Sequence, residues 1–196
     1  MPRVSYASLT EMEGGPETPH LGGNVREGDP YTFCPTVWTY VIERFCVRSV
    51  LDLGSGLGHA AEYFFRKGLR TVAIDGLAAN VQNAFYPTIC HDLTNGPVRT
   101  AVDLVHCQEV VEHIAEEHLG NLLQTFRCGR LILMTHAVPG QTGYHHVNER
   151  SSAYWVELIE KCGYKLMRTD TDRIRSLANQ DGATYMAATG LLFHRS

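Results

Sequence analysis

The chain has 196 residues, of which 44% are hydrophobic and 19% charged, and its formal net charge is −4. This length fits one globular domain with a sizeable core, and the acidic balance argues against a protein that binds nucleic acid through a strongly basic surface. None of the six cysteines forms a Cys-x-x-Cys pair, no apolar signal segment starts the chain, and no apolar run approaches the ~20 residues of a membrane span. We therefore expect a soluble, cytoplasmic protein with reduced cysteines and no membrane partner, whose oligomeric state stays open.

The N-terminal 30 residues differ in pattern from the rest of the chain. Residues 1–30 are interrupted by glycines and prolines and carry no hydrophobic period, so we expect a flexible arm. From residue 31 to residue 196, short apolar runs alternate with amphipathic segments of roughly ten residues, starting with a helix from about residue 36. Such alternation predicts a single α/β domain whose parallel sheet is covered by helices on both faces.

The expected elements follow one another along this domain. Strands are expected at 49–53, 71–75, 86–90, 102–107, 130–136, 164–170 and 184–194, and further helices at 60–68, 77–85, 113–128 and 151–163. No convincing helix separates the last two strands, which suits an antiparallel hairpin at the sheet edge. The predicted fold is a Rossmann-like, doubly wound sheet of about seven strands, mostly parallel with this antiparallel edge hairpin.

A glycine-rich loop follows the first strand, in D-L-G-S-G-L-G at 52–58. Glycine is needed where the chain turns sharply from strand to helix and where a ligand approaches the backbone closely. Such a loop alone is weak evidence for a nucleotide site, but three carboxylates accompany it. Asp52 lies inside the strand, Asp75 ends the second strand where it can bind ribose hydroxyls, and Asp92 follows the third strand, within reach of an adenine amino group.

These segments, followed by D-L-V-H-C-Q-E-V-V-E-H-I at 103–114, resemble in order the motifs of class I S-adenosylmethionine-dependent methyltransferases. The resemblance covers about residues 31–194 and implies a methyltransferase with S-adenosylmethionine as its cofactor. In that family the glycine loop lies under the methionine part, and the acids after the second and third strands contact ribose and adenine. The cofactor-binding residues implied are Asp52, Gly54, Ser55, Gly56, Gly58, Asp75, Gly76, Asp92, Leu93, Gln108 and Glu109.

A nicotinamide-dependent dehydrogenase is the main rival for such a loop. Its G-x-G-x-x-G pattern requires glycine at position 59, which is His59 in this chain. A Tyr-x-x-x-Lys pair exists at Tyr63 and Lys67, but it lies in the helix directly after the loop, far from the place of a catalytic pair. Hydride transfer is therefore not favoured.

Acidic and histidine side chains cluster after the fourth and fifth strands, where the acceptor should bind. Spacings of three and four residues place Glu109, Glu112 and His113 on one face of a helical turn, and a glycine-flanked loop carries His145 and His146. We favour a metal-free site in which His113, His145 or His146 acts as base or binds the acceptor. The alternative is a divalent-metal site formed by Glu109, Glu112, His113 and His146.

The metal alternative resembles the small-RNA 3′-end 2′-O-methyltransferases, which hold a metal at the terminal ribose with an E-x-x-E-H cluster and a distant histidine. This chain departs from them in its short connection to the second histidine and in its lack of a basic extension or a basic face. We therefore favour methyl transfer to an oxygen or nitrogen of a small-molecule or sugar-like acceptor over a nucleic acid. A metal-dependent RNA ribose methyltransferase, and a module that binds the cofactor without turnover, are the alternatives.

Overall fold

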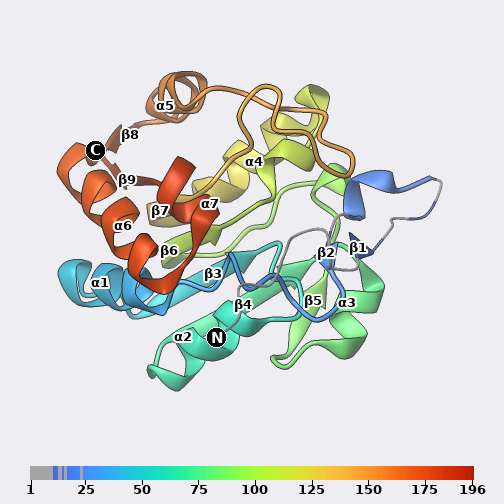
Figure 1. The fold of residues 1–196 in the computed structure, drawn as a ribbon, viewed down its shortest axis with the longest axis horizontal. Coiled ribbons are helices and arrows are strands. Elements are labelled where there is room, and N and C mark those ends of the chain that lie inside the picture. The colour runs from blue at the N-terminus through green and yellow to red at the C-terminus, as the bar shows by residue number, and fades with distance from the viewer. Residues whose placement is uncertain (1–10, 13–14, 16, 23) are drawn as a thin grey trace.

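A seven-stranded sheet forms the centre of the molecule in the computed structural model, which describes residues 11–12, 15, 17–22 and 24–196 (Figure 1). Its strand order is β5-β4-β3-β6-β7-β9-β8. All pairings are parallel except those of β9, which is antiparallel to both β7 and β8. The strands are β3 (Ser49–Leu53), β4 (Arg70–Asp75), β5 (Thr88–Cys90), β6 (Val102–Cys107), β7 (Gly129–Met134), β8 (Tyr164–Leu166) and β9 (Leu191–Arg195). The predicted class, a mostly parallel Rossmann-like α/β sheet, is confirmed.

Helices cover both faces of this sheet. They are α1 (Pro35–Phe45), α2 (His59–Arg66), α3 (Ala78–Asn83), α4 (Leu119–Phe126), α5 (Ser152–Glu160), α6 (Arg168–Asp181) and α7 (Thr184–Thr189). Short 3₁₀ turns occur at η2 (Pro19–Leu21), η3 (Leu93–Asn95), η4 (Val111–His113) and η5 (Glu116–His118). Among the described residues, no helix combines the length and the apolar character that crossing a membrane requires.

Alternate residues of each central strand belong to two separate hydrophobic clusters, because successive side chains of a strand point to opposite faces. On one face, Leu51 and Val105 pack with residues of α4 and α5. On the other face, Val50 and Leu104 pack with residues of α1, α2, α6 and α7. All five residues of β3 are buried. This is why the central strands read in the sequence as short continuous apolar runs.

The connection between the last two strands corrects the sequence prediction. Strands were expected at 164–170 and 184–194, joined as a hairpin, but the structure shortens them to β8 and β9 and places α6 and α7 between them. The two strands do pair antiparallel, as expected. Inside α6, Ile174, Leu177 and Ala178 are buried at helical spacing, so this polar segment packs on the sheet as a helix.

The expected flexible arm over residues 1–30 falls partly outside the described residues, namely at 1–10, 13–14, 16 and 23. Within the described part, β1 (Glu11–Met12) and β2 (Asn24–Val25) form a separate antiparallel pair. The turn η2 lies against the carboxyl end of β4, where a Cβ added at Gly76 would overlap the Leu21 side chain. Flexibility of the arm stays a prediction. Its turn η2 lies beside the carboxyl end of β4.

Candidate active site

A cavity of about 610 Å³ opens at the carboxyl ends of β3, β4, β5 and β6. This volume is within the range of small-molecule and cofactor sites. The wall includes every residue that the sequence predicted to bind the cofactor except Gly58. Of the three predicted catalytic histidines, His113 and His146 line the cavity and His145 does not. The four predicted metal ligands, Glu109, Glu112, His113 and His146, all line it.

The glycine loop after β3 adopts backbone conformations that favour glycine. Gly54, Gly56 and Gly58 have φ values of 68°, 54° and 81°, a region that side chains with a Cβ rarely enter. The amides of Gly54 and Ser55 both donate to the carbonyl of Ile74, each at 2.9 Å, which fastens the loop to β4. Gly58 is the N-cap residue of α2, and a Cβ added there would come within 3.2 Å of Cβ of Tyr86. Its role is therefore to shape the loop from outside the cavity.

Asp75, at the end of β4, organises the start of the same loop. Its Oδ2 accepts a hydrogen bond from the Gly56 amide at 2.8 Å, and its Oδ1 accepts from the Leu77 amide at 2.9 Å and from Asn80 Nδ2 at 3.1 Å. The side chain is 5% exposed, and this burial raises the pKa of Asp75 above its ordinary value. Asp75 thus faces the cavity while its position is fixed by three donors.

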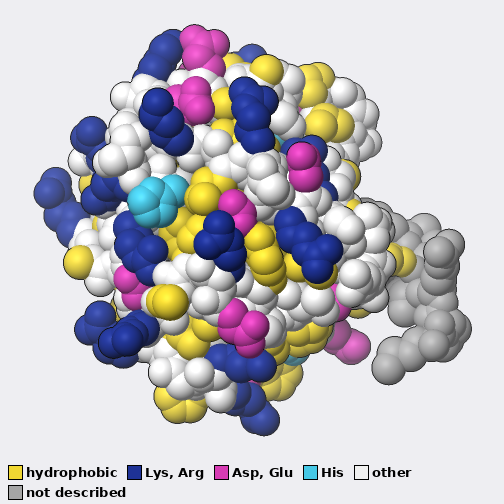
Figure 2. Space-filling view, turned by 90° about the vertical axis from the view of Figure 1, so that its left-hand side faces the viewer, with side chains coloured by type: hydrophobic (Ala, Val, Ile, Leu, Met, Phe, Trp, Pro, Cys, Tyr) yellow, Lys and Arg dark blue, Asp and Glu magenta, His cyan; other side chains and the backbone are white. Residues whose placement is uncertain are grey.

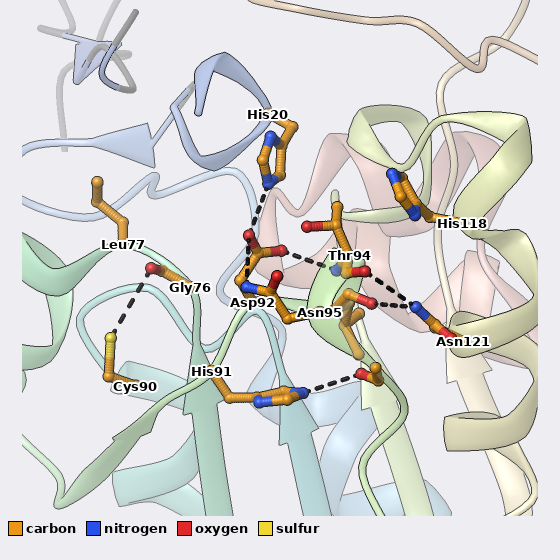
Figure 3. A network of polar contacts seen from close by, with 12 residues as sticks. His20, Gly76, Leu77, Cys90, His91, Asp92, Thr94, Asn95, His118 and Asn121 are labelled. Atoms are coloured by element: carbon orange, nitrogen blue, oxygen red, sulfur yellow. Dashed lines mark hydrogen bonds and ion pairs between the residues drawn. The ribbon is translucent and has the colours of Figure 1, made fainter. Parts of the chain in front are cut away.

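Asp92 connects the N-terminal segment to the loop after β5 (Figure 3). Its Oδ1 accepts from the Thr94 amide at 2.8 Å, which caps η3, and its Oδ2 lies 3.0 Å from Nε2 of His20. Burial alone would raise the pKa of Asp92, but the hydrogen bonds from Thr94 and His20 hold it below its ordinary value. His20 had no assigned role in the sequence, because an isolated histidine in an irregular stretch carries no pattern.

Asp52 lies in β3, and Gln108 directly follows β6. These two strands are neighbours at the middle of the sheet. Oδ1 of Asp52 is 2.6 Å from Nδ1 of His106, and its buried Oδ2 has no hydrogen-bond partner among the described residues. The buried hydroxyl of Ser55 is likewise without a partner in the described part of the chain. Gln108 Nε2 donates to the carbonyl of Thr32 at 3.0 Å, which ties the segment before α1 to the cavity. Two residues of the cavity wall thus each have a buried polar atom without a partner in the described part of the chain.

A second group of unsatisfied atoms surrounds the turn η4. Glu112 is fully buried, and neither its carboxylate oxygens nor Nδ1 of His113 has a hydrogen-bond partner among the described residues. One ligand atom each from Glu112, His113 and His146 lies within 4.8 Å of the others. Nδ1 of His146 lies 3.2 Å from Oε1 of Glu149. That carboxylate also accepts from the amides of Gly140 and Thr142, at 2.7 and 2.9 Å, so it orients His146 within its loop.

The electrostatics of this group follow from its burial. Burial raises the pKa of Glu109 to about 7, and burial together with Glu109 raises the pKa of Glu112 well above its ordinary value. Burial, with the nearby His146 and His145, lowers the pKa of His113 to about 4. His113 is therefore a neutral imidazole at neutral pH, able to accept a proton or to bind a metal ion.

Glu109 departs from the helical turn that the sequence predicted. Its φ is 54°, and η4 begins only at Val111. Thr135 Oγ1 accepts from the Glu109 amide at 2.8 Å and donates to Glu109 Oε1 at 2.7 Å. Glu109 lies outside the group formed by Glu112, His113 and His146. The expected helix over 113–128 is divided into η4, η5 and α4.

The loop after β7 is fastened to η4 by backbone contacts. The carbonyl of Glu112 accepts from the amides of Val147 and Asn148, both at 3.0 Å, and Asn148 Nδ2 donates to the carbonyl of Ile114 at 3.1 Å. Asn148 is 2% exposed. This contact brings His146 to His113, with ring centroids 5.1 Å apart. Neither Asn148 nor Glu149 was predicted from the sequence to belong to the site.

Comparisons with known proteins agree with this arrangement. A family model described as a methyltransferase domain matches residues 51–129, which include the glycine loop, Asp75, Asp92 and the turn η4. No curated protein sequence matches the chain significantly.

Solved structures with the same fold include three methyltransferases. A SAM-dependent methyltransferase from Archaeoglobus fulgidus has a TM-score of 0.60 and 16% identity, covering 86% of this chain and 96% of that one. Magnesium protoporphyrin IX methyltransferase (ChlM) from Synechocystis PCC 6803 with bound SAH has a TM-score of 0.60 and 16% identity, covering 82% of this chain and 80% of that one. The methyltransferase domain of bacterial CtHen1-C has a TM-score of 0.57 and 16% identity, covering 70% of this chain and 87% of that one. At these identities, the structural likeness shows a shared fold.

Proposed function

We propose that the chain is a class I S-adenosylmethionine-dependent methyltransferase, as the match of residues 51–129 to a methyltransferase-domain model supports. Its reaction would methylate a hydroxyl oxygen of a sugar-like small molecule, assisted by a divalent cation. S-adenosylmethionine supplies a methyl group that its sulfonium already activates, so the protein needs mainly to align the acceptor. The observation that carries the proposal is the buried carboxylate of Glu112, which has no partner among the described residues and lies beside two imidazoles.

The cavity residues fit the cofactor. Asp52 Oδ2 and the Ser55 hydroxyl are buried, without partners in the described part of the chain, and both residues line the cavity. A buried polar atom without a partner costs free energy, so a ligand with polar groups at these two positions would be stabilised. Asp75 and Asp92, beside β4 and β5, would hold the nucleoside, and the loop after β3 would hold the amino-acid part.

The cluster around η4 fits a divalent cation. Glu112, His113 and His146 would be its ligands, a carboxylate–imidazole set that suits Mn²⁺ or Fe²⁺. The contact of His146 with Glu149 is typical of metal-binding histidines, whose second nitrogen is oriented by a carboxylate. A cation bound there would favour ionisation of an acceptor hydroxyl. This geometry leads us to prefer the metal-assisted site over the metal-free site that the sequence favoured.

The charge of the cavity supports an uncharged acceptor. Eight carboxylate residues contribute to its wall, and burial raises the pKa of only two of them, Glu109 and Glu112, far above the usual range. Asp29 and Asp181 are among the other six and belong to neither the expected cofactor site nor the cation site. A phosphodiester would be repelled by these groups, whereas a neutral polyol could donate hydrogen bonds to them. A sugar-like small molecule therefore fits the wall better than an RNA end does.

A metal-dependent RNA ribose methyltransferase is the second candidate. One observation favours it: the structure brings His146 to the Glu112–His113 pair, as the resemblance to small-RNA 3′-end methyltransferases implies. In that case the acceptor would be the 2′-hydroxyl of a terminal ribose. The cluster is common to both candidates, so the acceptor has to be tested directly.

The first experiment measures cation binding without any acceptor. Protein treated with EDTA is titrated with Mn²⁺ in a calorimeter, and we expect binding by the wild type and a loss of at least about 100-fold in affinity for Glu112→Gln, more than an outer contact contributes. Glu116→Gln is the matched control, because its carboxylate is mostly exposed on the adjacent turn. Equal Mn²⁺ affinity in wild type and Glu112→Gln would refute the cation site.

The second experiment identifies the acceptor class. Methyl transfer from labelled S-adenosylmethionine is measured on a panel of sugars and polyols and on RNA with a free 3′ end, with EDTA and with Mn²⁺. We expect transfer to a member of the sugar panel that EDTA abolishes and Mn²⁺ restores. Transfer to RNA alone would establish the second candidate, and full activity in EDTA would exclude metal assistance.

A further inference from the structure

Three buried side chains from different elements form one chain of hydrogen bonds that ends at the cavity. Trp38 in α1 donates from Nε1 to Nε2 of His106 at 3.2 Å, and Nδ1 of His106 lies 2.6 Å from Oδ1 of Asp52. Asp52 and His106 face each other in the register of β3 and β6. All three residues are at most 3% exposed. The contacts are therefore shielded from water and fixed by the core.

The chemistry of these groups determines where the protons lie. An indole nitrogen can only donate, so Nε2 of His106 must accept and its ring proton is on Nδ1. Nδ1 then donates to Asp52 Oδ1, so the two contacts together set a single tautomer of His106. The rings of Trp38 and Phe64, with centroids 5.6 and 5.4 Å from that of His106, restrict rotation of the imidazole. Asp52 therefore has one oxygen bonded and one oxygen, Oδ2, directed elsewhere.

The free oxygen of Asp52 points to a cationic ligand. Oδ2 is buried without a partner among the described residues, and Asp52 is part of the cavity wall. A carboxylate oxygen that is removed from water and unpaired is costly. Asp75 and Asp92, on the β4–β5 side, are expected at the nucleoside. The centre of the sheet, at β3 and β6, is then left for the amino-acid end of the ligand.

We propose that His106, with its tautomer set by Trp38, is a positioning residue that directs Asp52 Oδ2 at the α-ammonium group of the cofactor's methionine part. This inference rests on the proposed cofactor site. It assigns a function to His106 and Trp38 beyond packing of the core. A purely structural role, in which the pair only joins β3 to β6, would affect every ligand of the cavity alike.

Two ligands separate these roles. S-adenosylhomocysteine carries the α-ammonium group, whereas 5′-methylthioadenosine has the same nucleoside and a thioether but lacks the amino-acid part. Calorimetric affinities are measured for both with wild type, Asp52→Asn, His106→Phe and His106→Asn. We expect His106→Phe and Asp52→Asn to weaken S-adenosylhomocysteine by about 10- to 100-fold, the range for a hydrogen bond to a charged group. Binding of 5′-methylthioadenosine should change less than twofold.

The remaining variants test the mechanism of positioning. His106→Asn keeps an amide donor near the position of Nδ1 and should restore most of the affinity. The double variant Asp52→Asn with His106→Phe should lose no more than either single variant, because the two residues act through one contact. Trp38→Phe keeps a ring and removes only the donor; it should weaken S-adenosylhomocysteine alone, and it serves as the test if His106→Phe does not fold.

The controls distinguish failure of this inference from failure of the proposed function. His118→Phe, in η5 and outside the cavity wall, is the matched histidine control and should bind both ligands as wild type does. An equal loss for both ligands in His106→Phe and Trp38→Phe, or no loss in either, would overturn the positioning role. Wild-type protein that binds neither ligand would overturn the cofactor site itself.

Discussion

Asp52 and Glu112 are both buried at the cavity, but their surroundings differ. One oxygen of Asp52 is hydrogen-bonded to His106, whereas both oxygens of Glu112 are without a hydrogen-bond partner in the described part of the chain. An uncompensated buried carboxylate costs several kcal/mol, so Glu112 must take up a proton or a cation. Burial and the nearby Glu109 raise its pKa accordingly. At residue scale, these surroundings are consistent with the ammonium contact proposed for Asp52 and with the cation site proposed at Glu112.

The first residue-scale prediction concerns Asp75. Its three donors place it at the cavity, where ribose hydroxyls would bind. We expect Asp75→Asn to weaken S-adenosylhomocysteine by about 1–3 kcal/mol, the cost of leaving polar groups without a partner. The loss should extend to 5′-methylthioadenosine, which keeps the ribose, in contrast to the His106 variants. Calorimetry measures both, with the exposed Asp172→Asn as control; unchanged affinity would refute the ribose assignment.

Local pattern explains which site residues the sequence could reveal. Asp52 was found because a charged residue inside an apolar strand is unusual, and Asp75 and Asp92 because they end or follow such a strand. The carboxyl ends of parallel strands meet at one edge of the sheet. The structure places all three in one cavity wall. The contacts of His20 with Asp92 and of Trp38 with His106 join residues 72 and 68 positions apart. No periodicity or spacing in one sequence records such a contact.

At the scale of elements, the loop after β7 completes the candidate cation site. Three hydrogen bonds hold it, two to the Glu112 carbonyl in η4 and one from the Asn148 side chain to the carbonyl of Ile114, directly after η4. His146 lies two residues before Asn148, so its position depends on this fastening. The loop also carries Thr142 and His145 at φ values of 56° and 49°. These backbone conformations are uncommon outside glycine and asparagine. The hydrogen bonds to Glu112 and Ile114 help to maintain them.

The element-scale prediction is that Asn148→Ala loosens this loop. Removing the side chain leaves the buried Ile114 carbonyl without its donor and frees the segment that carries His146. We expect Mn²⁺ affinity to fall by about 10- to 100-fold, as for other groups that orient metal ligands, while S-adenosylhomocysteine binding stays unchanged. Hydrogen exchange over 138–147 should become faster. Asn179→Ala is the control, because the Asn179 side chain donates to the Arg175 carbonyl within α6. A Mn²⁺ affinity of Asn148→Ala equal to that of the wild type would show that the contact with Ile114 is not required.

The error between β8 and β9 shows where elements escape sequence reasoning. The helix α6 has few apolar residues, and those that it buries are separated by polar ones. The helical period of its apolar residues was therefore weak in the sequence. The more apolar segments on either side of it, at 164–170 and 184–194, were predicted as strands joined directly to each other. The central strands were predicted well because both of their faces are buried, which makes them continuous apolar runs.

At the scale of the whole molecule, charge is distributed unevenly between the two edges of the sheet. Figure 2 shows a face rich in Lys and Arg, on the side of α1, α6 and the C-terminus. Arg48, Arg70, Arg130 and Lys165 lie at the amino ends of β3, β4, β7 and β8, away from the cavity with its eight carboxylate residues. This basic face was not expected from the sequence, because the net charge of −4 averages over the whole chain. The resulting field favours entry of a cationic cofactor at the carboxyl edge.

The whole-molecule prediction follows from the position of the cavity across four strands. A ligand there contacts the carboxyl ends of β3, β4, β5 and β6, which must separate when the domain unfolds. Its binding should therefore stabilise the entire domain by about 2.7 kcal/mol at a free concentration 100 times its Kd. For a chain of this length, this corresponds to a rise in Tm of about 5–11 °C. Thermal unfolding with S-adenosylhomocysteine measures the shift, and NAD⁺ at the same concentration is the control. A shift with NAD⁺ instead would assign the loop after β3 to a dinucleotide, because only a ligand that fits the folded cavity raises Tm.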